Sequence, residues 1–176
     1  MINLLILDVD GILTDGRKYY GLDGMPFIKT FSDKDWTAIK RFKALNIPVI
    51  FVTGDATVNE LVGMNRNIPV YLSRGMDKAD LVPIIEERFK CQSENMAYVG
   101  DDLFDIGIMR KIKYSFCTND SPSIVKKNCA IVMDKDGGDN VIMHLFDYCE
   151  NNNLIPQLSF DEIMLSINEL DKLEKF

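Results

Sequence analysis

The sequence predicts an α/β fold, a parallel sheet sandwiched by helices in a Rossmann-like arrangement. Short apolar runs alternate with amphipathic stretches of helical periodicity along the chain. Several of these runs end in aspartate, threonine or glycine, at the edge where open parallel sheets bind their ligands. Alternating strands and helices favour right-handed crossovers between parallel neighbours, and no low-complexity linker interrupts the alternation.

Six apolar runs are predicted to form the strands of this sheet. They are short and largely aliphatic or aromatic, which is typical of strands buried on both faces. They cover residues 2–7, 47–54, 68–73, 95–102, 114–119 and 129–133. A small β-hairpin is expected at about 17–31, because the sequence GLDG at 21–24 is flanked by β-favouring residues.

Helices are predicted between the strands, where apolar residues recur every three to four positions. Within 35–46, for example, Trp36, Ile39 and Phe42 form one apolar stripe. Pro83 is expected to make the helix within 76–90 begin late or bend. The other predicted helices cover 57–65, 103–112, 121–128, and a C-terminal pair at 137–153 and 159–176, which occupies about 139–176.

Length and charge limit the possible classes of protein. We expect a single domain over residues 1–176, long enough for a sizeable core. A formal net charge of −7 argues against nucleic-acid binding, and no apolar run approaches the roughly 20 residues of a membrane span. The four cysteines lack zinc-like spacing, so we expect reduced thiols in a cytoplasmic protein. The single histidine, His144, lies in a helical stretch and is expected to be structural.

Side chains suited to catalysis gather at the carboxyl ends of the predicted strands. Because these ends meet at one edge of a parallel sheet, we expect the side chains to lie close together. Carboxylates that share one edge need a compensating cation, and ligation by oxygen alone favours Mg²⁺. The residues concerned are, in chain order, Asp8 and Asp10, Thr53 and Gly54, Lys78, and Asp101 and Asp102.

These residue types fit phosphoryl transfer. An ionised Asp8 can attack phosphorus in line if a metal screens its charge from the phosphate. A protonated Asp10 can donate to the leaving alcohol and then accept a proton from the hydrolytic water. Lys78 and the Thr53 hydroxyl are suited to hold phosphate oxygens. The sequence therefore predicts a metal-dependent phosphate site.

Four motifs in this order resemble those of the haloacid dehalogenase superfamily of phosphotransferases. They are DVDG at 8–11, VTG at 52–54, Lys78 and GDDLFD at 100–105. The resemblance implies that Asp8 is the nucleophile and Asp10 the acid/base. It also implies that Mg²⁺ is held by Asp8, the main-chain carbonyl of Asp10, and Asp101.

The same resemblance assigns the remaining candidates. Thr53, Gly54 and Lys78 are expected to bind phosphate, and Asp102 or Asp105 to support the site from nearby. A simpler interpretation stays open for the last two: Asp102 is also suited to cap the following helix, and Asp105 to be a charge on its surface.

The length of the segments between the motifs indicates the branch of the superfamily. About 37 residues separate Asp15 from Thr53, and about 23 separate Gly54 from Lys78. The hairpin therefore stands in place of a cap domain. The chain is similar, over about residues 2–150, to the capless 3-deoxy-manno-octulosonate 8-phosphate phosphatase group. That similarity implies a sugar-phosphate substrate and a homotetramer in which hairpins pair and neighbouring subunits cover each site.

Three positions depart from that group. Asp55 replaces an arginine after the second motif, Trp36 follows Lys34 and Asp35 where the group has Arg-Asp-Gly, and Asp139 follows the glycine pair at 137–138. Lost arginines weaken recognition of a sugar acid's carboxylate. The cations that could replace them are Arg17, Lys34 and Arg74.

Two alternatives therefore remain beside a phosphatase for the acid sugar phosphate. One is a phosphatase for a different sugar phosphate or for a nucleotide. The other is a catalytically weak protein that uses the same fold for oligomerisation or binding. The intact set of Asp8, Asp10, Lys78 and Asp101 favours an enzyme.

Overall fold

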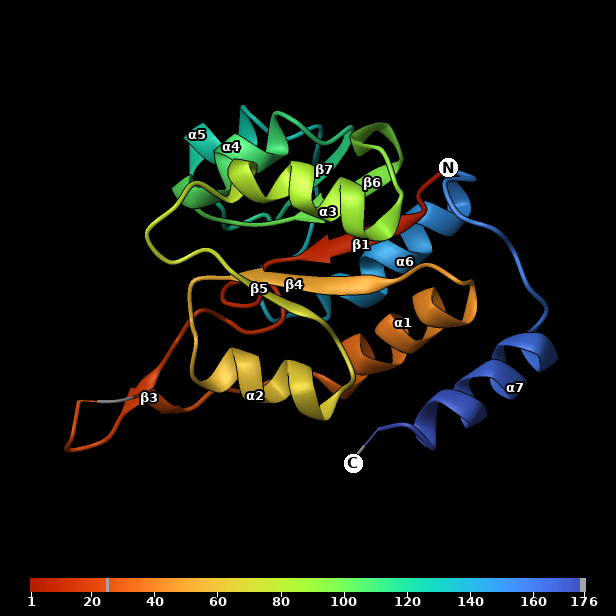
Figure 1. The fold of residues 1–176 in the computed structure, drawn as a ribbon, viewed down its shortest axis with the longest axis horizontal. Helices are drawn as coiled ribbons and strands as arrows, with labels where there is room; N and C mark the ends of the chain where they lie inside the picture. Colours follow the sequence, from red (N-terminus) through yellow and green to blue (C-terminus); the bar gives the residue numbers. More distant parts are fainter. Residues whose placement is uncertain (25, 175–176) are drawn as a thin grey trace.

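The computed structural model describes residues 1–24 and 26–174. Within these residues a parallel sheet has the strand order β5-β4-β1-β6-β7-β8 (Figure 1). Every neighbouring pair in it is parallel, so the predicted α/β architecture is confirmed. The strands are β1 (Leu4–Leu7), β4 (Val49–Thr53), β5 (Val70–Leu72), β6 (Met96–Val99), β7 (Tyr114–Cys117) and β8 (Ile131–Val132).

Helices cover both faces of the sheet (Figure 1). On one face lie α1 (Asp33–Ala44), α2 (Val58–Asn65) and α6 (Val141–Asn151). On the other face lie α3 (Val82–Phe89), α4 (Ile106–Met109) and α5 (Ser123–Lys126). The last helix, α7 (Phe160–Asp171), packs outside α1, away from the sheet. No helix of the described residues is long and apolar enough to cross a membrane.

The alternation of side chains along β1 explains why both faces must be covered. Leu5 and Leu7 point into the core beneath α1 and α6, and Leu4 and Ile6 point into the core beneath α3 and α4. All four are fully buried. Each such burial contributes about 1.5–3 kcal/mol, so a polar residue at any of these positions would be costly.

Two predicted helices are shorter than their apolar patterns. Within 76–90 the chain first forms a 3-10 turn over Lys78–Leu81, and α3 begins at Val82 with Pro83 in its first turn, as expected for a proline. Within 103–112 a 3-10 turn over Leu103–Asp105 precedes the four residues of α4. Both turns lie at the edge of the sheet that carries the candidate site.

The hairpin projects from the body of the molecule beside the carboxyl edge of the sheet (Figure 1). Its strands are β2 (Tyr19–Tyr20) and β3 (Pro26–Ile28), paired antiparallel. The Gly24 amide donates to the Gly21 carbonyl at 3.0 Å, and Gly24 has φ +74°, which favours glycine. Met25, part of the predicted hairpin, lies outside the described residues.

A buried carboxylate joins α1 to α6. Asp35 Oδ1 accepts from the backbone N–H groups of Ile142 at 2.9 Å and Met143 at 3.1 Å, in the first turn of α6. Asp35 Oδ2 is buried and has no hydrogen-bond partner among the described residues. Burial raises the pKa of Asp35 to about 6, and the two N–H donors oppose this rise.

We expect this carboxylate to make stability depend on pH. Because the pKa of Asp35 in the folded state lies above its ordinary value of 3.8, its stabilising effect is present below that value and is lost as the pH rises through about 6. Replacing Asp35 by asparagine removes this dependence. Between pH 4 and pH 7, the free energy of unfolding of the wild type should therefore fall by about 2–3 kcal/mol relative to that of the variant. Urea titrations of both proteins across this range measure the difference, and parallel curves would contradict it.

Candidate active site

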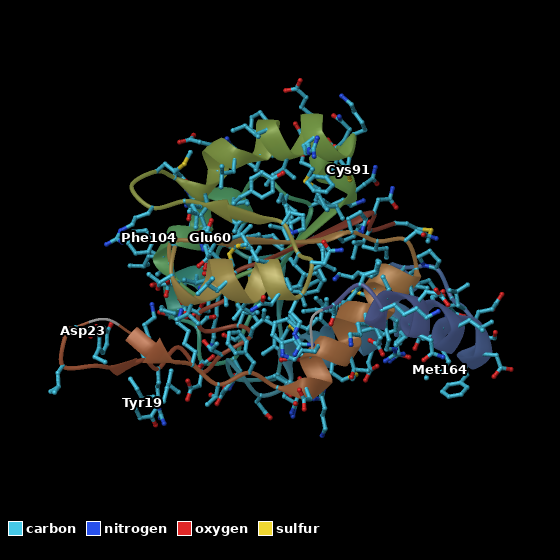
Figure 2. The ribbon with its side chains drawn as sticks, turned by 60° about the horizontal axis from the view of Figure 1, so that its bottom comes forward. Tyr19, Asp23, Glu60, Cys91, Phe104 and Met164 are labelled. Atoms are coloured by element: carbon cyan, nitrogen blue, oxygen red, sulfur yellow. The ribbon has the colours of Figure 1, made fainter. Side chains whose placement is uncertain are left out.

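The register of the sheet brings the predicted residues to one edge. Leu7 at the end of β1 pairs with Phe51 of β4 and Val99 of β6. The residues after these strand ends line a pocket of about 1100 Å³. Side chains at the base of the hairpin, Lys18 and Tyr20, form part of its wall. Figure 2 shows Tyr19 and Asp23 of the hairpin standing away from the body of the molecule.

Asp8 lies at the floor of this pocket, directly after β1. Its Oδ1 accepts from the Val9 N–H at 2.7 Å, and its Oδ2 accepts from Lys78 Nζ at 2.7 Å. Burial raises the pKa of Asp8 to about 7, and the neighbouring Lys78 opposes the rise. The two hydrogen bonds hold the carboxylate in one orientation.

Lys78 links two buried carboxylates. It is 5% exposed, and its Nζ lies 2.7 Å from Asp8 Oδ2, 2.7 Å from Asp105 Oδ1 and 3.3 Å from the Tyr98 hydroxyl. Burial alone would lower the pKa of Lys78, but the charges of Asp8 and Asp105 raise it above its ordinary value. The lysine therefore carries a fixed positive charge beside Asp8.

Asp105 is fully buried and is not a helix-surface charge. Its Oδ1 accepts from Lys78 and from the Tyr98 hydroxyl. Its Oδ2 accepts from the backbone N–H groups of Asp101 at 2.8 Å and Asp102 at 2.9 Å. With both oxygens engaged, Asp105 positions Lys78 and the loop that carries Asp101.

Asp101 completes an acidic cluster. Carboxylate oxygens of Asp8, Asp101 and Asp105 lie within 4.8 Å of one another. Asp101 Oδ1 is buried and has no hydrogen-bond partner among the described side chains and backbone. Burial, together with the charges of Asp8 and Asp105, raises the pKa of Asp101 to about 8. Oxygen atoms in this arrangement fit a hard divalent cation.

The chain before the cluster is shaped around Asp101. Gly11 has φ +82°, and a Cβ at this position would lie 2.1 Å from Asp101 Oδ2. Glycine at position 11 therefore lets the loop after β1 approach the carboxylate closely. Asp102 differs from Asp101, because it is exposed and its side chain accepts from the Leu103 N–H, capping the turn that follows.

Asp10 lies apart from the acidic cluster, among cations. Its Oδ1 is 2.7 Å from Lys29 Nζ, and its Oδ2 is 3.2 Å from Lys18 Nζ. The side-chain amide of Asn59 also donates to Asp10 Oδ2 at 3.2 Å. The sequence interpretation missed Lys29 and Asn59, because neither belongs to a motif or follows a strand of the parallel sheet.

Thr53 and Gly54 both line the pocket. The Thr53 side chain is buried, and its Oγ1 accepts from Asn59 Nδ2 at 2.8 Å and from the Asp55 N–H at 3.2 Å. Two accepted bonds leave the hydroxyl proton of Thr53 available to a ligand. Gly54 is exposed at the pocket wall, and apart from its two chain neighbours no described residue has an atom within 4 Å of where its Cβ would be.

The three cations suggested as replacements for the lost arginines do not all lie at the pocket. Arg74 lines the pocket. Arg17 and Lys34 are exposed and lie outside the set of described residues that line it. Lys18, which the sequence interpretation did not select, lines the pocket instead.

The positions that depart from the resembled group also have different roles. Asp55 lines the pocket and binds Lys29 Nζ at 2.6 Å. Trp36 is buried in the core against Phe31, and Asp139 is exposed outside the pocket lining. His144 is half-buried on α6 and is likewise not among the described residues that line the pocket.

Comparison with known proteins identifies the family of this chain. Residues 57–146 match the haloacid dehalogenase-like hydrolase family. The 3-deoxy-D-manno-octulosonate 8-phosphate phosphatase of Salmonella typhi is 34% identical over 148 residues, which cover 83% of this chain and 78% of that protein. The chain belongs to the haloacid dehalogenase-like hydrolases. Within this family it is a phosphatase.

Solved structures of haloacid dehalogenase-like phosphatases share the fold. The cobalt-bound deoxy-D-mannose-octulosonate 8-phosphate phosphatase of Haemophilus influenzae is 28% identical and superposes with a TM-score of 0.80 over 85% of this chain and 88% of its own. The 3-deoxy-D-manno-octulosonate 8-phosphate phosphatase of Yersinia pestis is 27% identical, with a TM-score of 0.76 over 97% of this chain and 84% of its own.

Proposed function

We propose that this phosphatase is a Mg²⁺-dependent phosphomonoesterase that acts through an aspartyl-phosphate, with a sugar phosphate such as 3-deoxy-manno-octulosonate 8-phosphate as its substrate. The observation that carries the proposal is Asp8 at the pocket floor, oriented by Val9 and Lys78 and adjoining the Asp101 carboxylate. A carboxylate held in this way is suited to nucleophilic attack. The names of the relatives support the substrate class.

The residues around Asp8 have separate roles in the proposal. Asp8 attacks phosphorus, and the ester oxygen leaves on the opposite side. Lys78 stabilises charge on the equatorial phosphate oxygens, since it already lies 2.7 Å from Asp8 Oδ2. The Thr53 hydroxyl and the Gly54 backbone N–H donate to the same phosphate. Asp10 gives its proton to the leaving oxygen and later takes one from the attacking water.

The acidic cluster is suited to hold the metal. The proposed ligands are the carboxylates of Asp8 and Asp101 and the main-chain carbonyl of Asp10. The buried, unpartnered Oδ1 of Asp101 supports this set, whereas Asp105 already accepts four hydrogen bonds, two on each oxygen, and Asp8 accepts only one on each. When bound, Mg²⁺ screens the charge of Asp8 from the phosphate dianion. Asp105 and Asp102 support the loop that carries Asp101.

A second substrate class is favoured by Asp55. This carboxylate binds Lys29 at 2.6 Å and lies 3.6 Å from Lys18 Nζ. Asp55 thereby neutralises Lys29 and weakens the attraction of Lys18 for a carboxylate of an acid sugar, and Arg74 is the other lining cation suited to pair with it. A phosphate ester of a neutral sugar or a nucleotide would not need such a partner.

Phosphate release from a panel of phosphomonoesters, with and without Mg²⁺, tests the proposal. We expect metal-dependent release, with the acid sugar phosphate preferred over neutral sugar phosphates and nucleotides. Equal rates across the panel would refute the acid-sugar assignment. No release from any ester by the folded, Mg²⁺-loaded protein would favour the binding or oligomerising alternative.

We also propose a cytoplasmic homotetramer in which the hairpins pair and each site is covered by a neighbour. Tyr19, Tyr20 and Leu22 on the hairpin are 61%, 62% and 111% exposed, which is a large apolar surface for one projecting element. The cysteines support a cytoplasmic location, since all four are free thiols.

Charge on the hairpin is expected to disrupt this assembly. The double variant Tyr19→Asp/Leu22→Asp should sediment as a smaller species than the wild-type tetramer, because buried charges without partners are costly. Leu165→Asp on α7, where Leu165 is 69% exposed, is the matched control and should remain a tetramer. A wild-type protein that sediments as a stable, active monomer would contradict the proposal.

A further inference from the structure

Lys29 is a buried cation that connects the hairpin to the candidate site. It follows β3 directly, and its side chain is completely buried. Its Nζ donates to Asp55 Oδ2 at 2.6 Å, to Asn59 Oδ1 at 2.8 Å and to Asp10 Oδ2 at 3.1 Å, and it also lies 2.7 Å from Asp10 Oδ1. An ammonium group has three protons, so these three acceptors use its full donor capacity.

We propose that Lys29 is a positioning residue that holds the Asp10 carboxyl in place for proton transfer to the leaving oxygen. This inference rests on the proposed function, in which Asp10 is the acid. It adds a residue of the hairpin to the catalytic requirements of the site.

The burial of Lys29 distinguishes positioning from substrate binding. The Lys29 side chain is completely buried and lies outside the described residues that line the pocket, whereas Lys78, which is proposed to bind phosphate, lines it. Lys18, in contrast, has a side chain that is 28% exposed and lies 3.2 Å from Asp10 Oδ2. Lys18 is therefore free to turn toward a substrate, and Lys29 is not.

Asp55 anchors Lys29 from the other side. Asp55 Oδ1 accepts from the Thr57 N–H at 2.8 Å and also from the Thr57 hydroxyl, at the start of α2. These bonds and Lys29 lower the pKa of Asp55 below its ordinary value, so the carboxylate stays charged. The chain of contacts Asp55–Lys29–Asp10 thus ties α2, the hairpin and the loop after β1 together.

Asp10 depends on Lys29 because this lysine is the cation nearest to its carboxylate among the described residues. Its side chain is 24% exposed, and Lys18 and Asn59 both approach its Oδ2 at 3.2 Å. Removing Lys29 takes away its 3.1 Å hydrogen bond to Oδ2 and its 2.7 Å contact with Oδ1, an oxygen that has no hydrogen-bond partner among the described residues. A displacement of about 1 Å in an acid/base group costs up to about 100-fold in rate.

A defect in proton donation depends on the leaving group, and this dependence separates it from general damage. An alkyl phosphate loses an alkoxide unless the oxygen is protonated, so it depends on Asp10. The phenolate of p-nitrophenyl phosphate is a stable anion and needs little protonation. A displaced Asp10 should therefore slow alkyl esters much more than this aryl ester.

The test compares kcat and KM of Lys29→Met with those of the wild type on the best alkyl phosphate and on p-nitrophenyl phosphate. We expect kcat for the alkyl ester to fall about 30-fold or more, kcat for the aryl ester to fall less than about 5-fold, and KM to stay close to the wild-type value. Asp10→Asn should show the same selectivity. The Asp10→Asn/Lys29→Met double variant should be no slower than Asp10→Asn alone.

Lys43→Met is the matched control for the loss of a partly buried, paired lysine. Lys43 is on α1, with its side chain 14% exposed and its Nζ 3.0 Å from the Arg66 carbonyl, outside the pocket lining. This variant should leave both substrates unaffected. If Lys29→Met does not fold, Asp55→Asn keeps the lysine but weakens its anchor, and should show the same leaving-group selectivity to a smaller degree.

The outcomes separate the two proposals. Equal losses on the alkyl and aryl esters, or losses that add in the double variant, would overturn the role of Lys29 in an enzyme that remains a phosphatase. A wild-type protein that releases phosphate from neither ester would overturn the proposed function, and the role of Lys29 with it.

Discussion

Asp8→Asn should reduce phosphate release by about 10⁴-fold or more, because the amide cannot form the covalent phosphoryl ester. The substitution keeps the size of the side chain and a carbonyl oxygen that can accept from Val9 N–H or from Lys78. The loss should therefore appear in kcat, with substrate affinity largely retained. Steady-state kinetics on the preferred ester measure both quantities.

The same substitution should leave the fold intact at neutral pH. Burial raises the pKa of Asp8 to about 7 from an ordinary 3.8, so ionisation of this group costs stability as the pH rises through 7. Asparagine removes that cost, and Lys78 keeps Asp105 as its partner. The melting temperature of Asp8→Asn at pH 7.5 should equal or exceed that of the wild type.

Asp102→Asn is the matched control for charge at the pocket. Asp102 is exposed and caps a turn, and asparagine caps equally well. Its activity should remain within a few-fold of wild type. An inactive Asp102→Asn beside an active Asp8→Asn would contradict the assignment of the nucleophile.

Asp105→Ala should produce the largest loss of stability. The substitution removes both acceptors of a fully buried carboxylate and leaves Lys78 with Asp8 as its remaining ion-pair partner among the described residues. The N–H groups of Asp101 and Asp102 also lose their acceptor. Breaking a buried ion pair costs about 3–5 kcal/mol, which corresponds to a fall in melting temperature of about 10 °C for a chain of this size.

Activity should fall with stability in Asp105→Ala, because Lys78 and the Asp101 loop both lose their support. Differential scanning calorimetry and kinetics below the transition separate the two effects. Tyr98→Phe removes one hydrogen bond to the same carboxylate and should cost about 1 kcal/mol. If Asp105→Ala were no less stable than Tyr98→Phe, Asp105 would not be the hub of this network.

The sequence alone predicted the architecture and the edge of the sheet that carries the site. Runs such as LLIL at 4–7 are apolar at every position, which indicates a strand buried on both faces. Parallel strands place their carboxyl ends at one edge, so Asp8, Thr53 and Asp101 could be expected to meet there. The pairing of Leu7 with Phe51 and with Val99 shows this alignment.

Part of the Asp105 role has a local sequence signal that the sequence interpretation did not use. Asp105 lies three residues after Asp102, the spacing at which an acidic side chain can reach back to a cap residue's N–H. The structure has this capping box, with Asp105 Oδ2 accepting from the Asp102 N–H. Its burial against Lys78 and Tyr98 had no such signal, because Lys78 lies 27 residues away and Tyr98 lies within the preceding strand.

The surroundings of Asp10 were decided by tertiary structure alone. Lys29 is separated from Asp10, Asp55 and Asn59 by 19, 26 and 30 residues, and a lysine after an exposed hairpin strand usually lies in water. Arg17 and Lys34 carry the same charge but remain exposed outside the pocket lining. Local patterns determined where each strand and its terminal carboxylate lie, since these depend on neighbouring residues. Which lysine enters the site depends on how the hairpin docks against the sheet edge, and no local pattern encodes that contact.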